Sequence, residues 1–103
     1  MVNVIIYLNN ELSASELVKQ LLSEQLISSA SIDKENVSYK IIDGEFSKSI
    51  YSVITAQSKA LLFNKIVQTV ESRFGSDVLI NSTPIVGSNE AFNESVRTHT
   101  LSI

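Results

Sequence analysis

The sequence contains no cysteine and no tryptophan, and it has one histidine among its 103 residues. Without thiols the chain can form no disulfide, thiolate metal site, cysteine nucleophile or iron–sulfur cluster. A single histidine likewise excludes a multi-histidine metal site within one chain. Copper binding is therefore expected to be weak or absent, because no cysteine and only one histidine can ligate the ion.

Basic residues and long apolar runs are scarce too. Eight Lys and Arg, scattered singly, stand against 11 Asp and Glu, and the net charge is −3. No basic face can neutralise phosphates, so no nucleic-acid partner is expected. No apolar run approaches the roughly 18 residues of a membrane helix, so no membrane partner is expected. Residues 1–8 carry no basic residue and contain Asn3, which indicates a strand rather than a signal peptide and makes the cytoplasm the expected compartment.

The composition suits one folded domain over residues 1–103. Hydrophobic residues make up 44% of the chain and charged residues 18%, which provides enough apolar surface for a core. The three glycines lie too far apart to form a phosphate-binding loop, and no Gly-x-Ser-x-Gly motif is present. Because no catalytic constellation stands out, the chain is not expected to be an enzyme.

Hydrophobic periodicity predicts the order β-α-β-β-α-β followed by a third helix. Strands are expected at residues 2–8, 37–41 and 77–86, with a return strand ending near residue 56, and helices at residues 13–25, 58–74 and 89–98. Residues 33–36 are expected to form a charged bulge or loop. Pro84 lacks a ladder donor and so places the last strand at an edge or at a bulge. This order is typical of the ferredoxin-like sandwich, an α+β fold with an antiparallel sheet, here with a short C-terminal helix.

Local signals predict where the first two helices begin and end. Ser13 and Glu16 have the spacing of a capping box, in which each side chain accepts from the other residue's amide. Ser58 is a candidate N-cap for the second helix. Gly75 can supply the positive φ that ends it.

Asp43-Gly44 predicts a two-residue β-hairpin, because a type I′ turn needs positive φ at both central residues. With this loop length, Ile41 lies opposite Phe46 and Val37 lies opposite Ile50. The apolar residues of the return strand depart from strict alternation, so a bulge or cover on both faces is expected.

Four carboxylates are the candidate metal ligands. Asp43 and Glu45 flank Gly44, and Glu90 and Glu94 share one face of the third helix at i, i+4 spacing. The alternatives are a solvated turn and a solvated helix face, because no further ligand stands at a supporting spacing.

The other residues that could have a functional role also have simple structural explanations. Asp33 and Glu35 lie two residues apart in a charged segment, and His99 is expected in an exposed tail without an orienting acid. Tyr7, Tyr39 and Tyr51 could line a pocket, although a strand tyrosine is more often simply buried.

Several segments match a known family in order and spacing over nearly the whole chain. They are Ala14 to Leu17, Glu24–Ala30, Ile42–Phe46, Ala56–Ser58 and Pro84–Ser95. Together they resemble the CutA-type divalent-cation tolerance family. The chain departs from the family pattern where Ser29 replaces a cysteine, where Ile42 and Ser95 replace tryptophans, and where Phe74–Asp77 replaces a His-Pro-Tyr segment. Those segments supply the family's proposed metal ligands and inter-subunit cleft, so the resemblance implies fold and assembly more than metal binding.

The resemblance implies a non-enzymatic homotrimer associated with tolerance to copper and other divalent cations, with no dedicated cofactor. The sheet face away from the helices carries Ile and Val among polar residues, which fits cover by another subunit. We expect the hairpin of about residues 37–56 at the centre of the trimer. The alternatives are a PII-like trimeric nucleotide sensor, disfavoured by the sparse Lys and Arg, and an enzyme whose site is composed across subunits.

Overall fold

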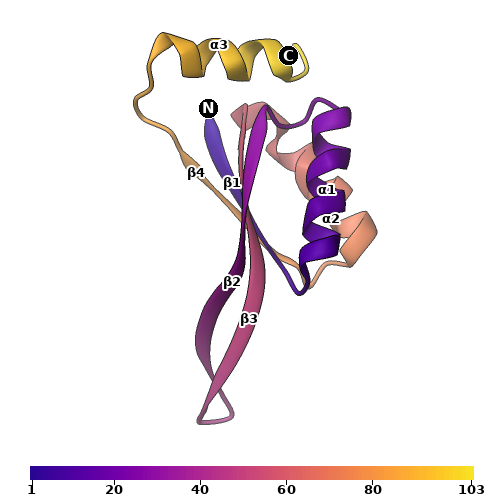
Figure 1. The fold of residues 1–103 in the computed structure, drawn as a ribbon, viewed down its shortest axis with the longest axis vertical. Helices are drawn as coiled ribbons and strands as arrows, with labels where there is room; N and C mark the ends of the chain where they lie inside the picture. Colours follow the sequence, from indigo (N-terminus) through magenta and orange to yellow (C-terminus); the bar gives the residue numbers. More distant parts are fainter.

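The computed structural model describes all residues, 1–103, as one sheet with three α-helices (Figure 1). The elements are β1 (Val2–Leu8), α1 (Glu11–Ser23), β2 (Ser29–Ile42), β3 (Glu45–Ser58), a 3₁₀ turn η1 (Ala60–Leu62), α2 (Phe63–Phe74), β4 (Leu79–Pro84) and α3 (Glu90–His99). The predicted β-α-β-β-α-β order with a terminal helix is confirmed. None of the helices is long and apolar enough to cross a membrane.

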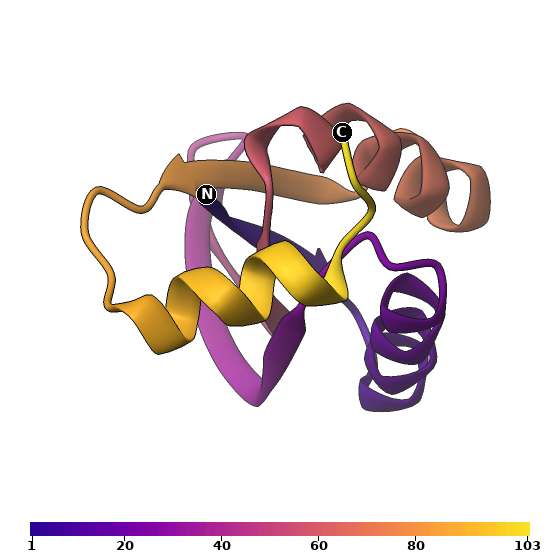
Figure 2. The ribbon, with the colours of Figure 1, turned by 90° about the horizontal axis from the view of Figure 1, so that it is seen from above.

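The sheet has the strand order β2-β3-β1-β4, and every neighbouring pair is antiparallel. This is the ferredoxin-like arrangement that the sequence predicted. α1 and α2 lie on the same face of the sheet, whereas no helix covers the other face (Figure 1). α3 lies across the end of the sheet at which the chain begins, as the view from above also shows (Figure 2).

The core fills the layer between the sheet and the two helices. Burial alternates along β1, so Val4 and Ile6 are fully enclosed while Ile5 faces the other way. The helices supply the opposite wall of this layer. Its fully buried members include Leu17 and Leu21 of α1, Ile66 and Val70 of α2, and Ile54 and Ala56 of β3. Each such Leu, Ile or Val contributes about 1.5–3 kcal/mol through the apolar surface it removes from water.

The long hairpin forms with the predicted turn and register. Asp43 and Gly44 have φ values of 52° and 81°, as a type I′ turn requires. Ile41 pairs with Phe46, and the ladder continues to the start of β2. Residues 33–36 contain a register shift in β2, which confirms the bulge among the two alternatives. β2 begins at Ser29, earlier than predicted, because its small polar residues pair with the far end of β3.

The capping box predicted at Ser13 is wrong. α1 begins at Glu11, and the side-chain oxygen of Asn10 accepts from the Ser13 amide at 2.7 Å. Asparagine is as good an N-cap as serine. The earlier start also places the Glu11 carboxylate in the first turn, where the helix dipole favours it. Leu12 is 69% exposed and forms no hydrophobic staple.

Three other element boundaries also differ from the predictions. Ser58 is not an N-cap: it is buried at the end of β3 and donates to the Leu26 carbonyl, and η1 separates it from α2. β4 begins only at Leu79 and ends at Pro84, which sits on an edge strand as predicted. α3 extends to His99, so this residue lies in a helix rather than in a tail. Gly75 ends α2 with φ of 89°, which confirms the prediction there.

We predict that Asn10→Ala lowers the free energy of unfolding by about 1 kcal/mol, because the Ser13 amide loses its acceptor. Asn9→Ala is the matched control, since the Asn9 side chain makes no hydrogen bond. Chemical denaturation of both variants and of Ser13→Ala measures the difference. Equal stability of Asn10→Ala and the parent chain, or a loss at Ser13→Ala as large as at Asn10→Ala, contradicts this assignment of the cap.

Candidate functional site

The four candidate metal ligands form two pairs that the fold keeps apart. Asp43 and Glu45 lie exposed at the tip of the hairpin, and Glu90 and Glu94 lie on α3 at the opposite end of the molecule (Figure 1). No group of three or more His, Asp or Glu side chains is placed to hold a metal ion. Metal binding by either pair alone stays a prediction.

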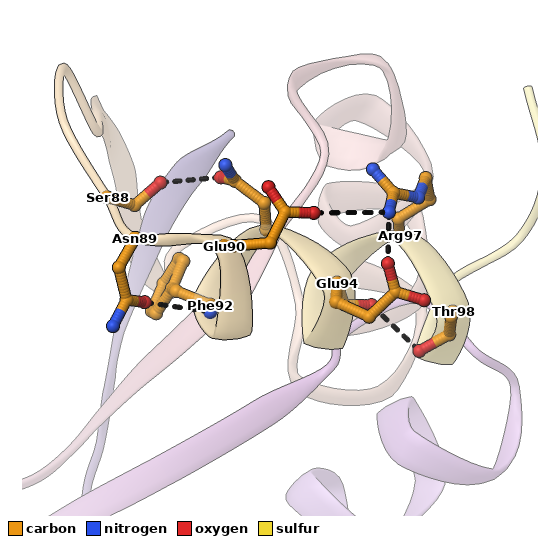
Figure 3. A network of polar contacts seen from close by, with 8 residues as sticks. Ser88, Asn89, Glu90, Phe92, Glu94, Arg97 and Thr98 are labelled. Atoms are coloured by element: carbon orange, nitrogen blue, oxygen red, sulfur yellow. Dashed lines mark hydrogen bonds and ion pairs between the residues drawn. The ribbon is translucent and has the colours of Figure 1, made fainter.

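Arg97 of α3 occupies the space between the two helix carboxylates (Figure 3). Its guanidinium lies 3.8 Å from the Glu90 carboxylate and also pairs with Glu94. All three side chains are more than half exposed, so these ion pairs add little stability. They do place a fixed positive charge where a cation would have to bind.

The start of α3 has its own polar contacts in the same view (Figure 3). The side-chain oxygen of Asn89 accepts from the Phe92 amide at 3.0 Å, which is an N-cap. The Ser88 hydroxyl donates to the Asn93 side chain at the same end. These contacts fix the loop before α3 and the start of the helix.

The other polar candidates also serve local structure. Lys34, between Asp33 and Glu35, places its ammonium 2.8 Å from the Glu11 carboxylate. The hydrogen bond and the charge of Glu11 raise the pKa of Lys34 above its ordinary value. The ring of His99 contacts the Ser95 carbonyl at 2.9 Å, and no carboxylate orients it. Lys34 thus forms an exposed ion pair, and His99 has no acidic partner.

The uncovered sheet face carries a row of side-chain hydrogen bonds. The Ser29 hydroxyl donates to the Gln57 side-chain oxygen at 2.7 Å, and the Gln57 amide donates to Asn3 at 2.9 Å. The row joins β2, β3 and β1 through side chains far apart in the sequence. No local sequence signal could have indicated it.

The outer half of the hairpin presents an apolar surface, which we call the hairpin patch. Residues two apart on a strand share a face, and the pairs Val37–Ile50 and Ile41–Phe46 align those faces across the ribbon. The patch consists of Val37, Tyr39, Ile41, Phe46 and Ile50. Their exposure ranges from 47% at Val37 to 86% at Phe46. Since the helices stop short of this half of the ribbon, nothing in the chain covers it (Figure 1).

The two sheet edges are free as well. β2, with 14 residues, pairs only with β3, and β4, with six residues, pairs only with β1. An unpaired edge presents a row of backbone donors and acceptors that can take up another strand. The apolar patch and the β2 edge make the hairpin side of the molecule the candidate interface, and the β4 edge lies at the opposite border of the sheet.

The adjacent apolar residues of β3 are explained without a bulge in that strand. Ile54 pairs with Ile6 in the core, while Val53 pairs with Tyr7 on the uncovered face. Tyr51 lies on that face too, and its ring packs edge-on against Tyr7 with centroids 5.5 Å apart. Tyr39 is largely exposed, but it joins the other two in the lining of one hollow of about 410 Å³, so the structure brings together all three tyrosines singled out from the sequence. Tyr7 and Tyr51 also line an adjoining cavity of about 340 Å³ at the base of the hairpin, together with Lys40 and Asp77.

Comparison of the sequence with protein-family models and with curated proteins finds no match. Comparison of the structure finds CutA1 proteins. CutA1 from Oryza sativa aligns over 99% of this chain and 94% of its own, with a TM-score of 0.90 and 16% identity. CutA1 from Pyrococcus horikoshii aligns over 99% and 100%, with a TM-score of 0.88 and 18% identity. The divalent cation tolerance protein (CutA1) of Thermus thermophilus aligns over 97% and 99%, with a TM-score of 0.86 and 21% identity. The chain therefore has the fold of CutA1 over its whole length.

We predict that the isolated protein binds Cu²⁺ weakly or not at all, because copper favours thiolate and imidazole ligands and the chain offers one imidazole. Titration calorimetry on tag-free protein should give no affinity tighter than micromolar. His99→Ala is the control for the single imidazole. Micromolar or tighter binding that survives this substitution contradicts the prediction and redirects attention to the carboxylate pairs.

Proposed function

We propose that this chain is a divergent CutA-like domain, a non-enzymatic cytoplasmic protein that works as a homotrimer in the tolerance of, or response to, divalent metal ions. The observation that carries the assembly is the exposed hairpin patch. The link to divalent ions rests on resemblance, both in the sequence segments and in the fold.

The similarity in fold supports this assignment because it extends over nearly the whole length of both proteins. The alignments with the three CutA1 structures cover 97–99% of this chain and 94–100% of the CutA1 chains. The Thermus thermophilus protein is named for divalent cation tolerance. The sequence segments from Ala14 to Ser95 follow the family order in the same register. A function shared with those proteins is the simplest proposal that fits both.

The hairpin patch supports an assembly for a reason independent of any relative. Full burial of an Ile or Phe side chain contributes about 1.5–3 kcal/mol, and the patch has five large side chains, each 47% exposed or more. A two-stranded ribbon is only marginally stable in water by itself. Contact with other copies would bury the patch and stabilise the ribbon at once.

The two unlike free edges allow copies of the chain to join head to tail. The β2 and β4 edges differ in length and sequence, so contact between unlike edges of two copies is head to tail. A head-to-tail contact either closes into a ring or grows into a filament. The resemblance to CutA indicates a ring of three, with residues 37–56 at its centre.

We predict a particle of about three times the 11.3 kDa chain mass at micromolar concentration, measured by light scattering or sedimentation. Phe46→Lys should lower that mass, because it places a charge in the patch without disturbing the core of the single chain. Leu12→Lys is the matched control: it adds the same charge at an exposed leucine of α1, away from the hairpin.

A stable monomer of the parent chain at these concentrations overturns the trimer. An unchanged mass for Phe46→Lys removes the hairpin patch from the interface. Circular dichroism of both variants verifies that the chain has remained folded.

A further inference from the structure

The loop between β4 and α3, residues 85–89, presents an apolar side chain to solvent. Val86 is 99% exposed, more than any other large hydrophobic residue. The loop is nevertheless held at both ends, since the Ile85 amide donates to the Met1 carbonyl at 3.0 Å and the Asn89 side chain caps α3 (Figure 3). Because the backbone is already fixed, covering Val86 with a partner orders few further groups. We call residues 85–89 the display loop.

The display loop and the hairpin patch lie toward opposite ends of the molecule. The hairpin turn marks one end of the long axis, whose extent is 46 Å, and the loop lies beside α3 near the other end (Figure 1). The two surfaces therefore cannot meet within one chain, but they can meet between two copies. Such a contact joins unlike surfaces, so it is head to tail and can close into a ring.

The charges beside the two surfaces are complementary. Lys48 pairs with Tyr39 across the hairpin, so it lies on the face of the patch. It is exposed and forms no ion pair within the chain. Next to the display loop, the Glu90 side chain is 83% exposed, and its one ion pair, with Arg97, spans 3.8 Å. A cation that is covered together with the patch needs a carboxylate, because an unpaired buried charge is costly.

We propose that the hairpin patch of one copy binds the display loop of the next copy, with Val86 packed against Phe46 and Glu90 paired with Lys48. This interface rests on the assembly proposed above, and it names the surface that covers the patch. Each surface supplies what the other lacks, which is apolar cover for an exposed side chain and a charge of opposite sign.

Charge reversal at the ion pair tests the contact between copies. Lys48→Glu and Glu90→Lys should each raise the concentration at which half of the particles dissociate by about tenfold or more, because each places like charges together. The double variant Lys48→Glu/Glu90→Lys restores opposite charges and should return this concentration to near the parent value. The hairpin and α3 lie at opposite ends of one chain, so this rescue can only act between copies (Figure 1).

The matched control for the rescue is Lys48→Glu/Glu24→Lys, because Glu24 is exposed at the end of α1 and forms no ion pair. This control should dissociate as readily as Lys48→Glu alone. Val86→Asp should also raise the midpoint of dissociation about tenfold or more, whereas Leu12→Asp, at another exposed apolar residue, should not. Rescue by the first double variant, together with weaker assembly of Val86→Asp, supports the interface. Absence of that rescue, an equal rescue by the control, or an unchanged midpoint for Val86→Asp overturns it.

The parent chain and Phe46→Lys separate this interface from the assembly itself. A parent chain that stays monomeric at micromolar concentration overturns both proposals. A parent trimer that Phe46→Lys dissociates, but that Val86→Asp and Glu90→Lys leave intact, overturns this interface alone. Circular dichroism verifies that each variant has remained folded.

Discussion

The hairpin is longer than the sheet to which it belongs, and most features of the molecule follow from this mismatch. β2 and β3 have 14 residues each, whereas β1 has seven and β4 has six. Within β3, only Ser52–Ser58 pair with β1, so Glu45–Tyr51 have β2 as their sole neighbour. The helices cover the inner half, and the outer half projects beyond them (Figure 1). The inner half of the hairpin therefore contributes to the core under α1 and α2, whereas the outer half has no core to pack against.

The same alternation of side chains has opposite consequences in the two halves. Ile54 and Ala56 of β3 point toward the helices and are fully buried, whereas Ile50 and Phe46, in phase with them, point where no helix lies. Exposed apolar residues that continue the core pattern beyond the core are typical of an interaction surface. The proposed trimer follows from this physical need, and its number of copies follows from resemblance. The cavity at the base of the hairpin arises at the point where the ribbon leaves the sheet.

Sequence patterns predicted those elements whose signals are local and uncontested. Asp43-Gly44 sufficed for the turn and its register, and helical spacing sufficed for α1 and α2. The start of α1 was misplaced because Asn10 and Ser13 are both good caps, and the sequence alone does not distinguish them. Ser58 looked like a cap because serine is common at that position, but its hydroxyl donates to the Leu26 carbonyl and Ser58 ends β3.

The candidate metal ligands were predicted from pairs of carboxylates close together in the sequence. Such spacing does not reveal that the Arg97 side chain lies between Glu90 and Glu94. Tyr7, Lys40, Tyr51 and Asp77 meet only after the sheet has formed, so spacing along the chain could not have identified the cavity.

Amide hydrogen exchange of the outer hairpin in the native particle tests the central claim most directly. A two-stranded ribbon in solvent opens easily, and its amides exchange far faster than those of the core. If other copies cover the hairpin patch, the paired amides of residues 37–50 should be protected as strongly as those of β1. Protection should fall when dilution dissociates the particle. Rapid exchange of residues 37–50 beside a well-protected β1, at concentrations where the particle is intact, would contradict the claim that assembly covers the hairpin.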